Sequence, residues 1–305
     1  MMAHERYTEQ VRLLVSLLPI VSQETDFALK GGTAINLFYR NLPRLSVDID
    51  LTYVPVKERA ESLADIDAAM DRIATAINLL PGVTGRRIAG GGRGDTRVEA
   101  VAGNLGVKIE TSPVARGTVL APEIRRVSPA VESQFRFAEM QVVSIEDLYG
   151  GKFHAALDRQ HPRDLYDVKL LYENEGITDD LFRVFLVYVA CSARPPHELL
   201  NPNPQALQDL FDKEFSGMTV EPVTVEELED VRTRFVADIQ TRLTGPSAAF
   251  LRSLQAVAPD FTLIDLPEAA NLPAVLWKLR NLERLIAENP KKHGKQSEAL
   301  EALLF

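Results

Sequence analysis

The chain has 305 residues, of which 46% are hydrophobic and 25% are charged, a balance that fits one large globular domain or two smaller ones. The 34 Lys and Arg residues are outnumbered by 43 Asp and Glu residues, and the formal net charge of -9 excludes a generally basic protein that coats nucleic acid. Any nucleic-acid site must therefore be local. Cys191 is the only cysteine, which excludes an intramolecular disulfide framework and a cysteine-rich zinc site.

The N-terminal segment carries no signal-peptide pattern. Its apolar run from Val11 to Val21 is short and is interrupted by Ser16 and Pro19. No apolar stretch approaches the roughly 20 residues that a membrane-crossing helix needs. We therefore expect a cytoplasmic protein with no membrane partner, which also fits the single cysteine.

The first half of the chain mixes predicted helices and strands. Thr33–Arg40 follows a glycine pair and is expected to be helical. Ser46–Thr52 alternates apolar and polar residues, which predicts a strand with one buried face. Val56–Leu79 has apolar residues at spacings of three and four, which predicts a helix. Further strands are predicted over Arg97–Val101, Leu105–Thr111 and Gln141–Val143, the first two joined by a short turn.

After Ser144 the pattern becomes almost wholly helical. Ser144 and Asp147 have the spacing of a capping box that opens a helix, and Pro162 marks the start of the next one. Further helix starts are indicated at Thr178, at Thr224 with Glu227 and at Pro246, and a last long amphipathic helix over Leu272–Glu288. We expect a mixed α/β domain over residues 1–175 and a helical domain over residues 176–305.

The most informative residues are two aspartates on the predicted strand Ser46–Thr52. Asp48 and Asp50 are one residue apart and project from the same face, about 7 Å from each other. Two such carboxylates repel and raise each other's pKa unless a cation neutralises them, which is the argument for Mg²⁺. Glu110 also lies opposite the apolar positions of its own strand. If the two strands are neighbours, Glu110 adds a third carboxylate to that surface.

A glycine pair precedes the aspartates. Gly31 and Gly32 allow backbone N–H groups to approach phosphate oxygens closely, and a helix that begins at Thr33 directs its positive end at them. A carboxylate surface beside such a turn suits phosphoryl or nucleotidyl transfer, in which metal ions activate a hydroxyl and stabilise the departing pyrophosphate. Each motif alone is more often a plain turn or a solvated surface pair, but their combination is much rarer and favours catalysis.

These motifs resemble the polymerase-β-like nucleotidyltransferase superfamily and, within it, the AbiEii/AbiGii-type nucleotidyltransferase toxins. The resemblance is carried by Lys30-Gly31-Gly32-Thr33-Ala34, Arg44 to Leu51, Val107 to Glu110, Lys152, Arg159, Arg163-Asp164, Asp167 and Leu272 to Leu282. It implies an α+β fold, with a mixed sheet flanked by helices as the nucleotidyltransferase domain and an all-helical C-terminal domain. It also implies NTP-dependent transfer of nucleotides to RNA, with tRNA 3′ ends the acceptor for some members. Inhibition of translation and growth, a role in phage defence and a companion antitoxin encoded nearby are further implications.

The resemblance also assigns roles to the residues that match its motifs. Asp48 and Asp50 become metal ligands for Mg²⁺, and Glu110 is the candidate third member of this catalytic set. Nucleotide binding is assigned to Gly31, Gly32, Thr33, Arg44, Ser46, Lys152, Arg159 and Asp167.

The second half of the site depends on helical spacing. Lys152 and Arg159 are seven residues apart and share a helix face, which could hold a triphosphate or be a solvated side of the helix. By resemblance, Lys152 contacts the nucleotide phosphates. Asp164 matches an aspartate that comes late in the sequences of the family, and it would orient Lys152 or Arg44. Asp167 is the alternative for the aspartate's role, because it lies three residues further on the same face.

Two glycine-rich features have two interpretations each. Gly150 and Gly151 lie inside a predicted helix at a cost of roughly 1 kcal/mol each relative to Ala, which calls for close approach of a ligand or close packing. A second stretch, rich in glycine and arginine, could contact an RNA backbone or form a solvated hairpin tip. Its arginines are Arg86, Arg87, Arg93 and Arg97.

Three functions remain open from the sequence. The leading one is an Mg²⁺-dependent nucleotidyltransferase toxin that transfers nucleotides from NTP to RNA, with tRNA the expected acceptor. The second keeps this chemistry but modifies a small molecule, a protein or the chain itself, which the acidic net charge permits. The third is a non-catalytic nucleotide-binding interaction module. Retention of the repelling pair Asp48 and Asp50 together with Glu110 and Lys152 argues against it.

Overall fold

A computed structural model describes residues 3–88 and 96–305 of the chain and divides it into two compact units. The first unit ends at Ser144 and also includes the later segment Gly217–Pro222. The second contains Ile145–Ser216 and Val223–Phe305. The units divide after Ser144, whereas the sequence placed the boundary at residue 175.

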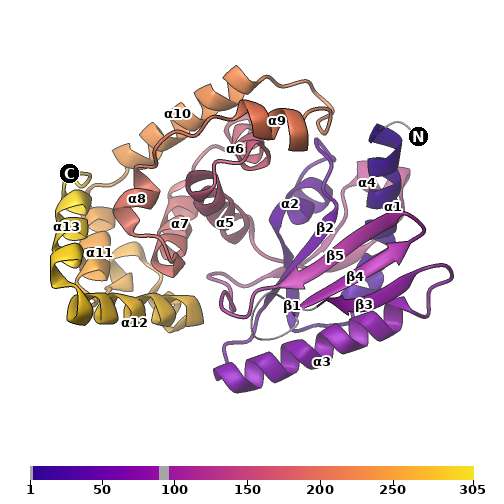
Figure 1. Ribbon diagram of the computed structural model, residues 1–305, viewed down its shortest axis with the longest axis horizontal. Helices are drawn as coiled ribbons and strands as arrows, with labels where there is room; N and C mark the ends of the chain where they lie inside the picture. The colour runs from indigo at the N-terminus through magenta and orange to yellow at the C-terminus, as the bar shows by residue number, and fades with distance from the viewer. Residues whose placement is uncertain (1–2, 89–95) are drawn as a thin grey trace. The chain divides into compact units, whose positions relative to one another are not determined.

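A mixed seven-stranded sheet forms the centre of the first unit, in the order β3-β4-β5-β2-β1-β7-β6 (Figure 1). The strands are β1 (Phe27–Lys30), β2 (Asp48–Tyr53), β3 (Thr84–Ile88), β4 (Arg97–Ala102), β5 (Leu105–Thr111), β6 (Glu123–Arg126) and β7 (Glu139–Val142). The pairs β2–β5 and β1–β7 are parallel, and the other neighbours are antiparallel. This arrangement confirms the mixed sheet that the sequence predicted.

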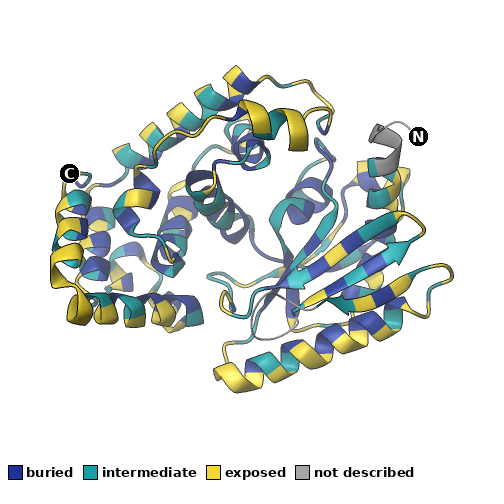
Figure 2. Ribbon diagram, viewed as in Figure 1, coloured by how far each residue is buried: buried dark blue, intermediate teal, exposed yellow. Residues whose placement is uncertain are grey.

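The predicted alternation is present on the central strands. Ile49 and Leu51 of β2 and Val107 and Ile109 of β5 are fully buried, and Figure 2 shows buried and less buried positions alternating along the sheet. The unpredicted strands β1, β3 and β6 are short, and β1 is buried at three of its four positions, so it shows no period of two.

Helices cover the sheet of the first unit. The helices α1 (Ala3–Val21) and α3 (Arg59–Ile77) pack against its strands and contact each other. The glycine pair opens α2 (Gly31–Ala34), which continues as a π-helix over Ile35–Tyr39, and α4 (Pro129–Gln134) is a further short helix. The helix predicted from Thr33 therefore begins two residues earlier, at Gly31.

The second unit is helical, as the sequence predicted. Its α-helices are α5 (Ile145–Asp158), α6 (Pro162–Asn174), α7 (Asp179–Cys191), α8 (Pro196–Leu200), α9 (Gln208–Glu214), α10 (Val225–Thr241), α11 (Gly245–Gln255), α12 (Pro273–Glu288) and α13 (Pro290–Glu301). Short 3-10 helices cover Phe261–Ile264 and Pro267–Asn271. Thr178 caps α7, and Thr224 and Glu227 form the predicted capping box of α10. No helix within the described residues is long and apolar enough to cross a membrane.

The glycine pair of α5 is explained by close packing on α7. A Cβ atom on Gly150 would lie 2.9 Å from Cδ2 of Tyr188, and one on Gly151 would lie 3.3 Å from its Cε1. The Tyr188 hydroxyl donates to Oδ1 of Asp147 on α5 at 3.0 Å. Because α5 is fitted to α7 in this way, it belongs to the helical unit together with α6, which follows it.

A segment between α9 and α10 returns to the first unit and pairs with the loop before β2. Leu45 N donates to Met218 O at 2.9 Å, and Val220 N donates to Pro43 O at 2.9 Å. Arg44 and Thr219 thus form an isolated antiparallel bridge. The loop that leads into Asp48 is therefore held on both sides of Arg44 by residues far along the chain.

Candidate active site

Charged side chains meet in register across three central strands. The parallel pairing of β2 and β5 places Asp50 opposite Glu110, and the antiparallel pairing of β1 and β2 places Lys30 opposite Asp50 on the other side. Directly opposed residues have neighbouring side chains on one face of a sheet. Asp48 and Asp50 share a face because they are two residues apart on β2. The two strands are neighbours, which is the condition on which Glu110 joins the aspartate pair.

The two glycines before this face make room for its side chains. Gly31 has a φ of 74°, in the left-handed region, and a Cβ atom there would lie 3.2 Å from both Cβ and Cγ of Asp50 and overlap its carboxylate. A Cβ atom on Gly32 would lie 2.6 Å from Nη2 of Arg44 and 3.0 Å from Oγ of Ser46. A side chain at either glycine would therefore collide with a neighbouring side chain, Asp50 in the case of Gly31 and Arg44 in the case of Gly32.

Thr33 ties the glycine turn to the aspartate strand. Its buried hydroxyl donates to the backbone oxygen of Asp48 at 2.5 Å and lies 2.9 Å from Oγ of Ser46. Lys30, at the N-cap of α2, gives no side-chain hydrogen bond to the helix. The Thr33 side chain thus holds the turn against β2, and the first backbone N–H groups of α2 are the parts of the turn suited to phosphate.

Lys30 is a site residue to which the sequence analysis assigned no role. Burial lowers its pKa, while the charges of Asp50 and Glu110 act in the opposite direction. Glu110 in turn pairs with Nε of Arg97 at 2.8 Å, its register partner on β4. The carboxylate face is therefore flanked by a cation on each side. The signal that could have found Lys30 is its position directly before the glycine pair.

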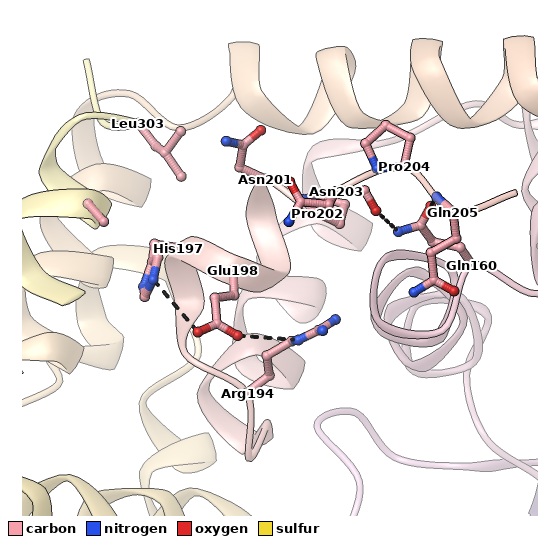
Figure 3. Close-up of a pocket in the computed structure, with 11 residues that line it drawn as sticks. Gln160, Arg194, His197, Glu198, Asn201, Pro202, Asn203, Pro204, Gln205 and Leu303 are labelled. Atoms are coloured by element: carbon pink, nitrogen blue, oxygen red, sulfur yellow. Dashed lines mark hydrogen bonds and ion pairs between the residues drawn. The ribbon is translucent and has the colours of Figure 1, made fainter. Parts of the chain in front are cut away.

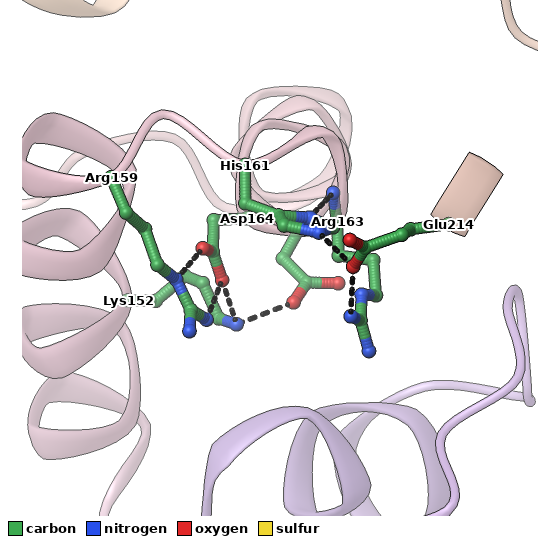
Figure 4. A network of polar contacts seen from close by, with 7 residues as sticks. Lys152, Arg159, His161, Arg163, Asp164 and Glu214 are labelled. Carbon is green, nitrogen blue, oxygen red and sulfur yellow. Dashed lines mark hydrogen bonds and ion pairs between the residues drawn. The ribbon is translucent and has the colours of Figure 1, made fainter. Parts of the chain in front are cut away.

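Four predicted residues form one buried ionic cluster in the second unit (Figure 4). Lys152 Nζ lies 2.8 Å from Oδ1 of Asp164 and 2.9 Å from Oδ2 of Asp167, and both carboxylates are fully buried. Arg159 reaches Oδ2 of Asp164 through Nε at 2.6 Å, and its side chain is 63% exposed. Asp164 and Asp167, the two alternatives for the family's aspartate, thus both contact Lys152. Arg159 is the solvent-exposed member of the cluster.

The charge of Asp164 is strongly stabilised in this cluster. Burial alone would raise its pKa, but the charge of Lys152 and the hydrogen bonds from Arg159 outweigh burial and hold the pKa well below its usual range. Asp164 also lies in the first turn of α6, where the helix dipole favours an anion. His161 fixes the start of this helix by accepting a hydrogen bond from Arg163 N at 3.1 Å.

The family comparison decides the class of protein. The family model described as nucleotidyl transferase AbiEii toxin of type IV toxin–antitoxin systems matches residues 12–281, which include every site residue named above. The chain belongs to the AbiEii nucleotidyltransferase toxin family. Membership makes it an NTP-dependent transferase and the toxin of a toxin–antitoxin pair, so the resemblance noted from the motifs is confirmed.

The fold agrees with this membership. The structure is similar to that of MenT4, a nucleotidyltransferase toxin from Mycobacterium tuberculosis H37Rv. The TM-score is 0.58 over 98% of this chain and 94% of that chain, with 15% sequence identity. No curated protein sequence matches the chain significantly. The similarity to MenT4 therefore concerns the fold.

The donor set of this AbiEii chain fits a hard divalent cation. Asp48 and Asp50 offer carboxylate oxygens from one strand face, and Mg²⁺ is commonly held by one or two carboxylates together with substrate phosphates. Within residues 3–88 and 96–305, no group of three or more His, Cys, Asp and Glu side chains is arranged to hold a metal. The ion pair of Glu110 with Arg97 agrees with that finding. The two aspartates therefore fit a metal that the nucleotide itself helps to hold.

The arginines beside the glycine-rich stretch have acidic partners. Arg86 pairs with Glu99 at 2.5 Å, and Arg87 pairs with Asp67 at 2.6 Å. Arg97 pairs with Glu110, as described above, and Arg93 lies outside the described residues. Each of these three arginines thus forms an ion pair with an acidic side chain.

A cavity of about 160 Å³ lies beside Arg44 in the first unit. It is lined in part by Leu45 and by Met218 of the returning segment. Ligand pockets usually enclose about 300–1,000 Å³, so this cavity is too small to hold a nucleotide. It marks instead where the returning segment packs on the loop before β2.

Proposed function

We propose that this AbiEii-family chain is an Mg²⁺-dependent enzyme that transfers nucleotides from an NTP to the 3′ end of tRNA in the cytoplasm and thereby stops translation and growth. The observation that carries the proposal is the three-strand register of Lys30, Asp50 and Glu110, with Asp48 on the same face and the glycine turn beside it. This arrangement concentrates carboxylates where backbone N–H groups can receive phosphates.

Asp48 and Asp50 are proposed to hold Mg²⁺, with Glu110 as the candidate third carboxylate. When bound, the metal would lower the pKa of the attacking hydroxyl and stabilise charge on the departing pyrophosphate. Gly31, Gly32 and the backbone of Thr33 would receive the triphosphate, with nucleotide contacts also from Arg44 and Ser46. These assignments rest on donor chemistry and on the packing of the turn against β2.

Lys152 is proposed to contact the nucleotide phosphates, with Asp164 and Asp167 fixing its ammonium group. Arg159 is proposed as a second, solvent-exposed phosphate contact. A lysine held by two buried carboxylates has little freedom of position.

The proposed reaction balances as a displacement at phosphorus. The acceptor hydroxyl oxygen forms a bond to the α-phosphorus of the NTP, and the bond from that phosphorus to the oxygen bridging to the β-phosphate breaks. Pyrophosphate leaves with the electron pair of that bond, and the hydroxyl proton is released. The chain's own residues position the triphosphate and neutralise the charge that develops on pyrophosphate.

The acceptor is tested by incubating the purified chain with Mg²⁺ and each α-phosphate-labelled NTP in turn, with total tRNA or with buffer alone. The proposal predicts that label from at least one NTP moves to tRNA. Label retained on the protein would instead support self-modification, the second function left open by the sequence. An NTP that binds without labelling tRNA, protein or a small molecule would support a non-catalytic nucleotide-binding module.

A further inference from the structure

A polar pocket of about 470 Å³ lies wholly within the second unit, between α8, the segment that follows α8, and α13 (Figure 3). Its size falls in the range of small-molecule sites. Figure 3 shows His197 and Leu303 at one end and Gln160 and Gln205 at the other. None of the predicted site residues lines it.

Some of the polar groups in this pocket are already used by the fold. Gln160 donates through its side-chain amide to Asn203 O at 2.8 Å and accepts from Gln205 N at 3.1 Å. Arg194 pairs with Asp158 at 2.9 Å and lies 3.6 Å from Glu198. The two carboxylates outnumber the single guanidinium, so the pocket does not favour an anionic group in its interior.

One polar atom of a pocket residue has no hydrogen-bond partner within the described part of the chain. Nδ1 of His197 is buried without a hydrogen bond, and its Nε2 is 3.9 Å from Glu198. Burial lowers the pKa of His197, which favours the neutral ring with one donor and one acceptor nitrogen. The exposed amide side chains of Asn203 and Gln205 also line the pocket, which thus offers hydrogen bonds to an uncharged ligand that carries both donors and acceptors.

A nucleobase has this chemistry. Its edges carry donors and acceptors, and its faces stack on flat groups such as an arginine guanidinium. Arg194 provides such a plane, and Pro202 and Pro204 provide apolar surface in the same pocket. A base bound there would need its phosphates outside the pocket, because two carboxylates and one guanidinium leave the interior with a net negative charge.

Two lysines of α13 share a helix face with a residue that lines the pocket. Lys292 and Lys295 precede Ala299, a pocket residue, on one stripe of α13, at helical spacings of seven and four. Lys295 is about 6 Å and Lys292 about 10 Å from Ala299 along the helix axis. Both side chains are exposed. The salt bridges among the described residues include neither ammonium group, and the first turn of α13 carries no acidic residue.

We propose that this pocket binds the base of an unpaired nucleotide while Lys295 and Lys292 contact its phosphate and the next one. The ligand chemistry is a nucleotide, supplied by a single-stranded stretch of RNA or by a free nucleotide. The choice of RNA as the ligand rests on the proposed function. An RNA acceptor needs a local binding surface on this chain, because the net charge of the chain is -9. The pocket is a site additional to the carboxylate face.

The test measures binding of a short fluorescein-labelled single-stranded RNA by anisotropy across a range of KCl concentrations, without NTP or Mg²⁺. Ala299→Trp fills the pocket and should weaken binding at least about tenfold, the effect of losing one stacked base. Lys292→Ala with Lys295→Ala should lower the salt slope by about 1.4, since each phosphate contact on a single strand contributes about 0.7. Lys213→Ala, which removes one exposed lysine charge from α9, should bind as the parent does.

Competition with unlabelled AMP, CMP, GMP and UMP separates the two sources. A mononucleotide that binds the parent but not Ala299→Trp supports the site with a free nucleotide as its ligand. Gln205→Ala shortens an exposed side chain of the pocket, and it replaces Ala299→Trp as the pocket variant if Ala299→Trp fails to fold. If folded pocket and lysine variants bind RNA and every mononucleotide as the parent does, the proposal is wrong. This readout does not depend on nucleotide transfer, so it stands apart from a failed transfer assay.

Discussion

At the scale of single residues, the buried cluster around Lys152 limits what the second unit can do. Two fully buried aspartates bind one lysine, and Arg159 adds a second positive charge, so the formal charges of the cluster cancel. A buried pair of this kind is weak evidence for stability but is strongly disrupted when one partner is removed. The cluster therefore holds Lys152 in one position, which is what a phosphate contact needs.

We predict that Asp164→Asn lowers the free energy of unfolding by about 3 kcal/mol at neutral pH, the low end of the range for breaking a buried pair, because Asp167 still compensates Lys152. The folded-state pKa of Asp164 is depressed. Its charge therefore stabilises the fold above about pH 4, the unfolded value, and less as pH falls below it. Urea unfolding should show the gap between parent and variant narrowing below pH 4. A gap that is independent of pH would contradict the charge assignment.

At the scale of elements, the glycine turn packs directly against β2. The backbone conformation of Gly31 is therefore linked to the position of the Asp50 carboxylate. Gly31 has a positive φ and lies against Asp50, whereas Gly103, in the turn between β4 and β5, has a positive φ and nothing within 4 Å of a Cβ atom. The two positions therefore share a left-handed backbone conformation and differ in what a methyl group would displace.

We predict that Gly31→Ala and Gly103→Ala each destabilise the fold by roughly 1–2 kcal/mol, the cost of a left-handed conformation for an L-residue. Only Gly31→Ala should also lose nucleotide transfer, because its methyl group displaces the Asp50 carboxylate. Thermal unfolding and the transfer assay, run on both variants, separate the two effects. Equal activities of the two variants would show that Asp50 is not held for catalysis by this turn.

At the scale of the whole molecule, local patterns predicted the aspartate strand, the strand that carries Glu110, the helical second half and the capped starts of α7 and α10. They did not predict β1 or Lys30, because a four-residue buried strand has no alternation to detect. They also missed the return of Gly217–Pro222 to the first unit, since pairing across such a sequence separation depends on the tertiary fold.

Prediction of the site from the sequence was limited in the same way. Spacing placed Asp48, Asp50 and Glu110 on matching faces, but it could not reveal that Glu110 pairs with Arg97. It also left Asp164 and Asp167 as alternatives, whereas both contact Lys152. Sequence spacing fixes which residues share a face, and only packing determines which of them meet.

The central claim is that Asp48 and Asp50 form a metal-dependent centre for nucleotide transfer to RNA. The most direct measurement compares the rate of label transfer from NTP to tRNA by the parent, Asp48→Asn and the control Asp209→Asn, whose carboxylate is exposed on α9, over a range of MgCl₂ and with EDTA. We predict that EDTA stops the parent, and that Asp48→Asn falls by more than about 100-fold with unchanged thermal stability. That loss exceeds what removal of groups that merely orient metal ligands costs. Transfer by Asp48→Asn at the parental rate would contradict the account.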